Sequence, residues 1–127
     1  MQAYPEIKRF IQETLGCSCP EEVFNKIDYI KNEHSEIWEK KINIGDRLLI
    51  YIINPDKNSA IHERVQSALR QGVEERNKKG FNRFRLVVVA SQPDEQEGPI
   101  ESTFAGSEYV DDRTHLHVVT ESEVEGI

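Results

Sequence analysis

The sequence lacks a long apolar segment, and it contains only two cysteines in 127 residues. A membrane-spanning helix needs about 20 predominantly apolar residues, and no run in this chain approaches that length. Two cysteines, Cys17 and Cys19, cannot form the disulfide framework of a small secreted domain. The first residues, Met1 to Glu6, also lack the basic start and apolar stretch of a secretory signal. We therefore expect a cytoplasmic protein with no membrane partner.

Glycine-rich phosphate loops are also missing, so the sequence does not indicate a nucleotide-binding cradle. Basic residues are a minority, because 16 Lys and Arg stand against 23 Asp and Glu, a formal net charge of −7. The acids are concentrated in residues 91–127, which contain ten acids and one arginine. Such a segment repels nucleic acid. We expect a protein or small-molecule partner instead, and the sequence leaves its identity and the oligomeric state open.

What the sequence does contain is a strand–helix–strand pattern over residues 47–91. Two continuous apolar runs, Leu48–Ile53 and Leu86–Ala90, indicate strands that are covered on both faces, as in a parallel pair. The helix predicted between them, at 59–79, has one stripe of apolar or small residues: Ile61, Val65, Ala68, Leu69, Gly72 and Val73. A connection of this length predicts a right-handed βαβ unit whose two strands are parallel, buried and central.

Shorter elements are predicted on both sides of this unit. Two short N-terminal helices are indicated, one ending at Gly16 and the next beginning at Pro20. Alternating patterns indicate two strands at 29–33 and 36–44, which with the first βαβ strand form an antiparallel meander. A further strand is predicted at 114–120.

The acidic segment 92–112 contains prolines and glycines, and it predicts a long loop. We interpret residues 1–127 as a single domain of the α/β class, with α+β as the alternative. The predicted architecture is one mixed sheet of about five strands with two short N-terminal helices and one long crossover helix.

The stretch Cys17-Ser18-Cys19-Pro20 is the first candidate site. Because Cys19 lies at or near a helix N-terminus, unpaired N–H groups and the helix dipole favour its thiolate. Two thiols one residue apart can close a strained disulfide of the readily reduced kind, or they can give soft ligands to a metal such as zinc. Either interpretation makes Cys17 and Cys19 the functional residues. The alternative is a pair of buried cysteines that act as small apolar residues.

His115 and His117 occupy alternate positions of the last predicted strand, so both side chains lie on one face. Two imidazoles on one face can provide half of a metal site. With Cys17 and Cys19 they would complete a Cys2His2 set, if the fold brings the four residues together. The alternative is a pair of exposed histidines on an edge strand.

Polar residues follow both predicted parallel strands, at the edge where open α/β sheets bind ligands. They are Asn54, Asp56, Lys57, Asn58 and Ser59 after the first strand, and Gln92, Asp94 and Glu95 after the second. An anion could bind at the start of the following helix, near Lys57. We prefer the simpler interpretation that Asn58 or Ser59 caps this helix.

Basic residues alternate with aromatic ones where the long helix leads into the second strand: Arg76, Lys78, Lys79, Phe81, Arg83, Phe84 and Arg85. Such a segment can hold nucleic acid by phosphate contacts and stacking. Cations at a helix C-terminus also complement its dipole, Gly80 ends the helix, and Phe84 is expected in the core. We prefer this structural interpretation.

The predicted order of helix, three strands, helix and strand resembles the core of restriction-endonuclease-like nucleases. Glu39-Lys40-Lys41 has the Glu-x-Lys spacing of that family, and Asp28 would be the upstream carboxylate. The resemblance implies a magnesium ion bound by Asp28 and Glu39 beside Lys41. It covers residues 3–91 in element order, and Glu-x-Lys falls here on the second predicted strand rather than the third.

From these candidates the sequence favours a small thiol-centred protein, redox-active or metal-handling, that acts through Cys17 and Cys19. The first alternative is a non-catalytic binding or regulatory module that uses segment 92–112 or 76–85. The second alternative is a magnesium-dependent nuclease-like domain.

Overall fold

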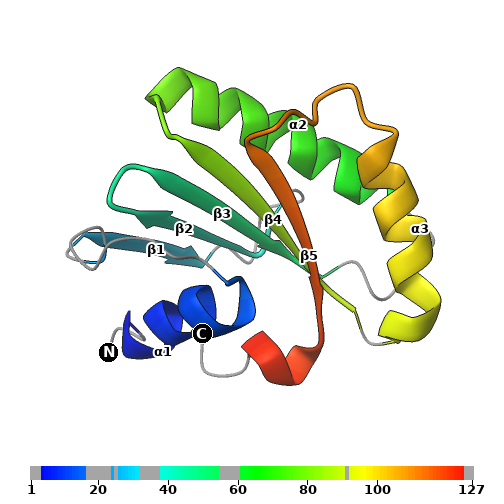
Figure 1. The fold of residues 1–127 in the computed structure, drawn as a ribbon, viewed down its shortest axis with the longest axis horizontal. Coiled ribbons are helices and arrows are strands. Elements are labelled where there is room, and N and C mark those ends of the chain that lie inside the picture. Colours follow the sequence, from blue (N-terminus) through cyan, green and yellow to red (C-terminus); the bar gives the residue numbers. More distant parts are fainter. Residues whose placement is uncertain are drawn as a thin grey trace.

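The computed structural model describes residues 4–16, 24, 26–31, 38–54, 61–90 and 92–124. Five strands form one mixed sheet in the order β1-β2-β3-β4-β5 (Figure 1), which confirms the predicted fold class. In chain order the elements are α1 (Tyr4–Arg9), the π-helical η1 (Phe10–Thr14), β1 (Ile27–Lys31), β2 (Lys40–Ile44), β3 (Leu48–Ile53), α2 (Ile61–Lys79), β4 (Arg83–Val89), α3 (Pro93–Ala105), β5 (Thr114–Val119) and the 3-10 helix η3 (Glu121–Val124).

The first three strands form the predicted antiparallel meander. The turn between β2 and β3 is made by Gly45 and Asp46, which both have positive φ angles. Arg47 completes this three-residue loop, since Ile44 pairs with Leu48 and Arg47 N donates to Ile44 O at 3.0 Å. The two positive φ angles favour Gly, Asn and Asp. The turn expected between β1 and β2 lies in residues 32–37, outside the described residues.

The central βαβ unit is also confirmed. β3 and β4 pair in parallel from Leu48 opposite Arg83 to Ile53 opposite Val88, and every side chain of β3 is buried. The helix between them packs closely, since a Cβ atom at Gly72 of α2 would lie only 2.1 Å from the ring carbon Cζ of Phe84. Gly72 therefore lets the long helix approach the sheet.

The acidic segment after β4 is not the long loop that we predicted, because α3 occupies most of it. Proline at the first helical turn lacks an N–H that would be unpaired there anyway. Asp94 and Glu95 in the same turn complement the helix dipole. Ile100 is buried against the sheet, and Pro99 lies on the exposed side. The prediction was wrong because it treated each proline and glycine as a helix breaker.

Helices cover both faces of the sheet. Helices α2 and α3 pack on one side, which we call the α2 face, and α1, η1 and η3 pack on the other, the α1 face (Figure 1). The first predicted N-terminal helix is confirmed, since Ile7, Phe10 and Ile11 are buried on the α1 face. The helix predicted from Pro20 lies outside the described residues.

An ion pair between a buried arginine and an exposed aspartate fixes the start of β5 to the end of α2. The Arg76 side chain is 1% exposed, and its Nη1 and Nη2 donate to Asp111 Oδ1 and Oδ2 at 2.9 and 2.6 Å. Nη1 also donates to Thr114 Oγ1, at the first residue of β5, at 3.0 Å. The Arg76 guanidinium thus holds the pKa of the Asp111 carboxyl well below its usual range.

In the described part of the chain, no helix combines the length and apolar character that a membrane span requires.

Candidate functional site

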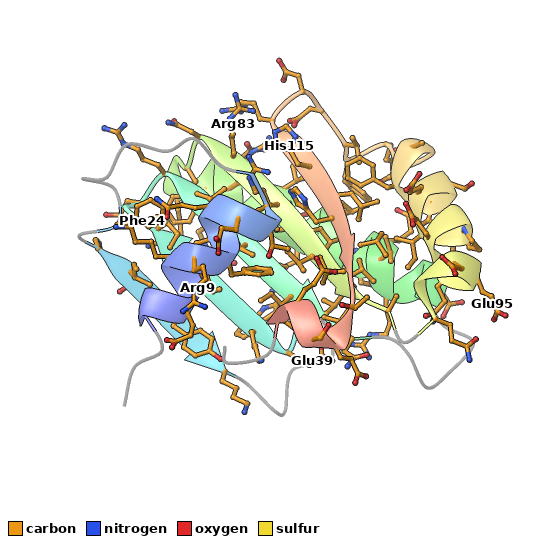
Figure 2. All side chains as sticks on the ribbon, turned by 60° about the horizontal axis from the view of Figure 1, so that its bottom comes forward. Arg9, Phe24, Glu39, Arg83, Glu95 and His115 are labelled. Atoms are coloured by element: carbon orange, nitrogen blue, oxygen red, sulfur yellow. The ribbon has the colours of Figure 1, made fainter. Side chains whose placement is uncertain are left out.

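Two arginines and two histidines meet on the α1 face of β4 and β5. Arg83 Nη1 lies 2.8 Å from His115 Nε2, and Arg85 Nη1 lies 2.8 Å from His117 Nε2. The strands are parallel neighbours, and alternate residues of each strand share a face. Figure 2 shows Arg83 and His115 together at the amino ends of the two strands. We call these four residues the Arg/His cluster.

The contacts fix the protonation of both histidines. A guanidinium group has only donors, so each Nε2 must accept the hydrogen bond, and the imidazole proton must lie on Nδ1. Burial lowers the pKa of His117 to about 4, with Arg85 and His115 adding to the shift. Burial and the two arginines also lower the pKa of His115. Both imidazoles are therefore neutral at pH 7.

Within the described residues, no ion pair joins Arg83 or Arg85 to a carboxylate. In the described part of the chain, the oxygen that accepts from these guanidinium groups is Leu15 O, at 3.3 Å from Arg85 Nη1. Arg85 is half-buried, and its Nε has no hydrogen-bond partner among the described residues. Burial, followed by the charge of Arg83, lowers the pKa of Arg85. A buried cation without an acidic partner is costly, and an anion would remove that cost.

A groove of about 660 Å³ runs along β5 beside the cluster. On the α1 face it is lined by Thr14, Arg85, the two histidines and Glu123 of η3, and on the α2 face by Glu97, Glu101 and Phe104. Glu101 raises the pKa of Glu97 through a hydrogen bond and through its negative charge. The α3 side of the groove is therefore acidic, whereas the other side has the cation Arg85 along the strand and the carboxylate of Glu123, which accepts from Thr120 N at 2.9 Å, at its η3 end.

The cysteines of the first sequence prediction, Cys17 and Cys19, lie outside the described residues. Their proposed reactivity and their pairing with His115 and His117 stay predictions. The described chain approaches the cluster just before them, because Arg85 contacts the carbonyl oxygen of Leu15. Among the residues that the structure describes, no group of three or more potential ligands is arranged to hold a metal ion.

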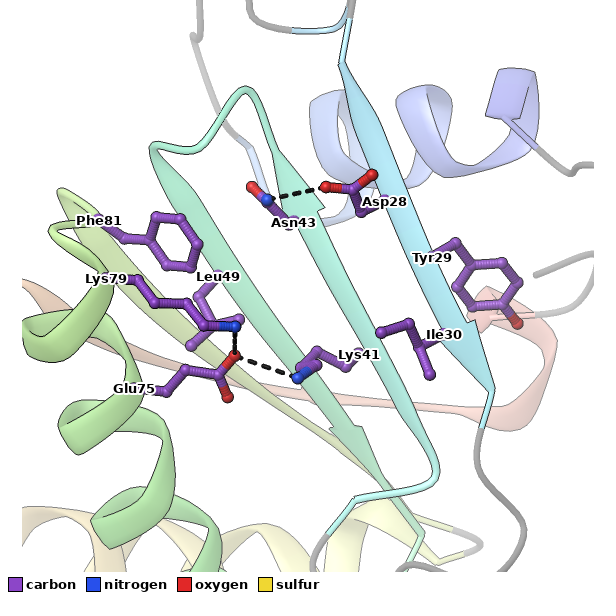
Figure 3. Close-up of a pocket in the computed structure, with 9 residues that line it drawn as sticks. All are labelled: Asp28, Tyr29, Ile30, Lys41, Asn43, Leu49, Glu75, Lys79 and Phe81. Atoms are coloured by element: carbon purple, nitrogen blue, oxygen red, sulfur yellow. Dashed lines mark hydrogen bonds and ion pairs between the residues drawn. The ribbon is translucent and has the colours of Figure 1, made fainter.

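Two residues of the nuclease-like pattern, Asp28 and Lys41, line one pocket of about 350 Å³, and Glu39 is not among the residues that line it. Asp28 accepts a hydrogen bond from Asn43 on the neighbouring strand, at 3.1 Å. Glu39 accepts from Arg64 at 2.8 Å, whereas Lys41 donates to Glu75 at 3.1 Å. Figure 3 shows Asp28 and Lys41 directed to these separate partners.

Lys41 belongs to a network that surrounds one carboxylate of α2. Glu75 accepts hydrogen bonds from the ammonium groups of Lys41 and Lys79 (Figure 3). It also accepts one from the Tyr51 hydroxyl. Burial acts to raise the pKa of Glu75, but the three donors outweigh it and the pKa is lowered. Burial also raises the pKa of Tyr51. This network is satisfied internally, and it joins α2 to the meander.

The edge after the parallel strands is described only in part, since residues 55–60 lie outside the described ranges. The main-chain N–H of Asn54 donates to Glu39 at 2.9 Å. Gln92 precedes α3, and its main-chain N–H donates to Gln96 Oε1 at 2.9 Å. Asp94 and Glu95 are exposed in the first turn of α3. The hydrogen bonds of Glu39 and Gln96 thus satisfy main-chain N–H groups at the end of β3 and the start of α3.

The basic and aromatic segment does not form one surface. Arg76 is buried against Asp111, and both Phe81 and Phe84 are buried in the core. Arg83 and Arg85 lie on the opposite face of the sheet, in the Arg/His cluster. Sequence reasoning missed the cluster because it considered the arginines and the histidines separately. The alternating Arg-x-Arg and His-x-His patterns on two strands were the available signal.

No family model matches the chain. The comparisons with curated proteins and with solved structures also found no significant match.

Proposed function

We propose that this protein is a non-catalytic binding module that recognises an anionic group, a carboxylate or a phosphate, through the Arg/His cluster. The observation that carries the proposal is that Arg83 and Arg85 pair with neutral imidazoles. Arginine is the residue best suited to bind oxyanions in a bidentate manner, and here its guanidinium groups have no oxyanion partner among the described residues. An oxyanion entering the groove can accept from the guanidinium groups and displace the weaker imidazole acceptors.

The cluster also offers the entering anion a second pair of donors. Once the anion lies beside His115 and His117, its charge favours protonation of both rings, and a protonated imidazole donates from both nitrogens. The anion would then face up to four cationic side chains on one half-open surface. Such a site binds by charge and hydrogen bonding and needs no nucleophile.

The test is a titration with inorganic phosphate and, separately, with acetate, followed by NMR chemical shifts at pH 7. We expect saturable shifts in β4 and β5, and a loss of affinity of about tenfold or more in Arg85→Gln, because a hydrogen bond to a charged group is removed. Arg70→Gln is the matched control, since Arg70 is an exposed arginine of α2. Equal affinity in wild type and Arg85→Gln would overturn the proposal.

A thiol-centred redox or metal-handling function at Cys17 and Cys19 is the second candidate. The contact between Arg85 and Leu15 O favours it, because a cation then lies close to the chain two residues before Cys17. Nearby cations lower the pKa of a thiol and increase the reactivity of its thiolate.

Differential alkylation with mass spectrometry tests this second candidate, together with zinc analysis of protein purified without chelator. We expect Cys19 to react faster than Cys17 in the native protein, and mild oxidation to join the two reversibly. Cys17→Ser serves as the control that isolates Cys19. Thiols that react only after denaturation would identify both cysteines as buried residues and end the thiol proposal.

A further inference from the structure

β5 ends the described sheet, and half of its main-chain groups are directed away from it. Phe84 N donates to Arg113 O at 3.0 Å, and Ala90 N donates to Val119 O at 2.8 Å. The odd-numbered residues of β5 therefore face β4, and the N–H and C=O groups of Leu116 and Val118 face the outer edge. No described strand pairs with them there, and such an edge is a template for a further strand.

Charged side chains line both sides of the groove along this edge. Arg85 lines it on the α1 face with His115 and His117, and Glu97 and Glu101 of α3 line it on the α2 face. Glu123 lies at the η3 end of the α1 face, where its Oε1 accepts hydrogen bonds from Thr120 N and Oγ1. The side chains of an added strand would point alternately to these two sides. A strand that alternates acidic and basic residues would match both at once.

We propose that the outer edge of β5 binds an extended peptide as a sixth strand, with its acidic side chains on the Arg/His cluster and its basic side chains on Glu97 and Glu101. The inference rests on the proposed function, because the cluster supplies the anion-binding half of the site. The main-chain groups of Leu116 and Val118 give affinity, and the two charged sides set the register.

The acidic side of the groove decides between a peptide and a nucleic acid. A phosphate backbone carries only negative charge, so it would be repelled by Glu97 and Glu101. It also lacks the regularly spaced amide groups that pair with a strand edge. The combination of an open strand edge with two opposite charges therefore fits a polypeptide.

The probe is a blocked, fluorescently labelled octapeptide in which Glu and Lys alternate. The control peptide has the same composition, with four Glu followed by four Lys. We expect the alternating peptide to bind more tightly, by roughly fivefold or more, because only its pattern presents one charge to each side of the groove. Equal binding of the two peptides would overturn the proposal.

Two variants test the edge and the acidic side. Val118→Pro removes an outward N–H, and proline is tolerated at such edge positions, so binding of the alternating peptide should be lost while phosphate binding is kept. The double variant Glu97→Gln/Glu101→Gln changes exposed residues that leave the core intact, and it should abolish the preference for the alternating peptide. Glu63→Gln/Glu74→Gln, on exposed positions of α2, is the matched control for charge.

The outcomes separate this inference from the proposed function. If phosphate binds but the alternating peptide is not preferred, the proposal of a sixth strand is overturned, whereas the proposed anion site is retained. Loss of both phosphate binding and peptide preference in Arg85→Gln supports both. Peptide preference that survives in the Glu97→Gln/Glu101→Gln variant contradicts the proposed register and overturns the inference.

Discussion

At the scale of single residues, Arg76 and Arg85 differ in the hydrogen-bond partners of their guanidinium groups. Arg76 is almost fully buried and has a bidentate carboxylate partner in Asp111. Arg85 is less buried, and its partners are the neutral His117 ring and a carbonyl oxygen. The first arrangement is complete without a ligand, whereas the second leaves a positive charge available for one. Because of this contrast, we assign a structural role to Arg76 and propose a binding role for Arg85.

The role of Arg76 gives a prediction about stability. Asp111→Asn leaves a buried cation without its carboxylate, so we expect the free energy of unfolding to fall by about 1.5–3 kcal/mol. Urea unfolding measures the change, and Asp112→Asn, at an exposed neighbouring position, is the control. A loss in Asp111→Asn no larger than in Asp112→Asn would show that the pair contributes little.

The same pair has a pH dependence of known sign. The pKa of Asp111 is lower in the folded protein than in the unfolded chain, so the unfolded chain takes up the proton first as the pH falls. The stabilisation is complete above the ordinary pKa of an aspartate and is lost as the pH falls below it. Asp111→Asn should therefore flatten the acid limb of the unfolding profile, and an unchanged acid limb would contradict this assignment.

At the scale of elements, the contact between α2 and β4 can be tested with glycine. Gly72→Ala would normally stabilise a helix, but here the new Cβ would lie 2.1 Å from Phe84 Cζ. We expect a loss of about 1–3 kcal/mol from overpacking. Gly98→Ala in α3 is the matched control, because nothing lies within 4 Å of its new Cβ. It should be neutral or stabilise the protein by up to about 1 kcal/mol. Equal effects in urea unfolding would show that α2 does not pack on Phe84 in this way.

The elements also show where sequence patterns are informative. Continuous apolar runs predicted β3 and the second part of β4, because burial on both faces leaves no position for a polar residue there. The sequence of Pro93–Ala105 wrongly predicted a loop, because α3 has one packed side and several residues that usually break helices. Its few apolar contacts, such as Ile100, form only once the sheet is present. Local sequence does not contain that information.

At the scale of the whole molecule, part of the charge asymmetry of the sequence is found at one strand edge. Of the acids of the carboxyl third, Glu97 and Glu101 lie on α3, and Glu123 lies at the η3 end on the side of the Arg/His cluster. The histidine pair was predictable from its alternation, but its arginine partners were not assigned to it. Their pairing depends on the register between β4 and β5, which only the assembled sheet defines.

The central claim is that the Arg/His cluster keeps its histidines neutral until an anion arrives. The most direct measurement is an NMR pH titration of the His117 ring, with and without sulfate, an anion whose charge is constant over the range used. Burial lowers the pKa of this ring, and Arg85 and His115 add to the shift, so without sulfate we expect an apparent pKa of about 4. Sulfate should raise that pKa by pairing with the arginines and with protonated His117. An ordinary histidine pKa that sulfate does not move would contradict the account.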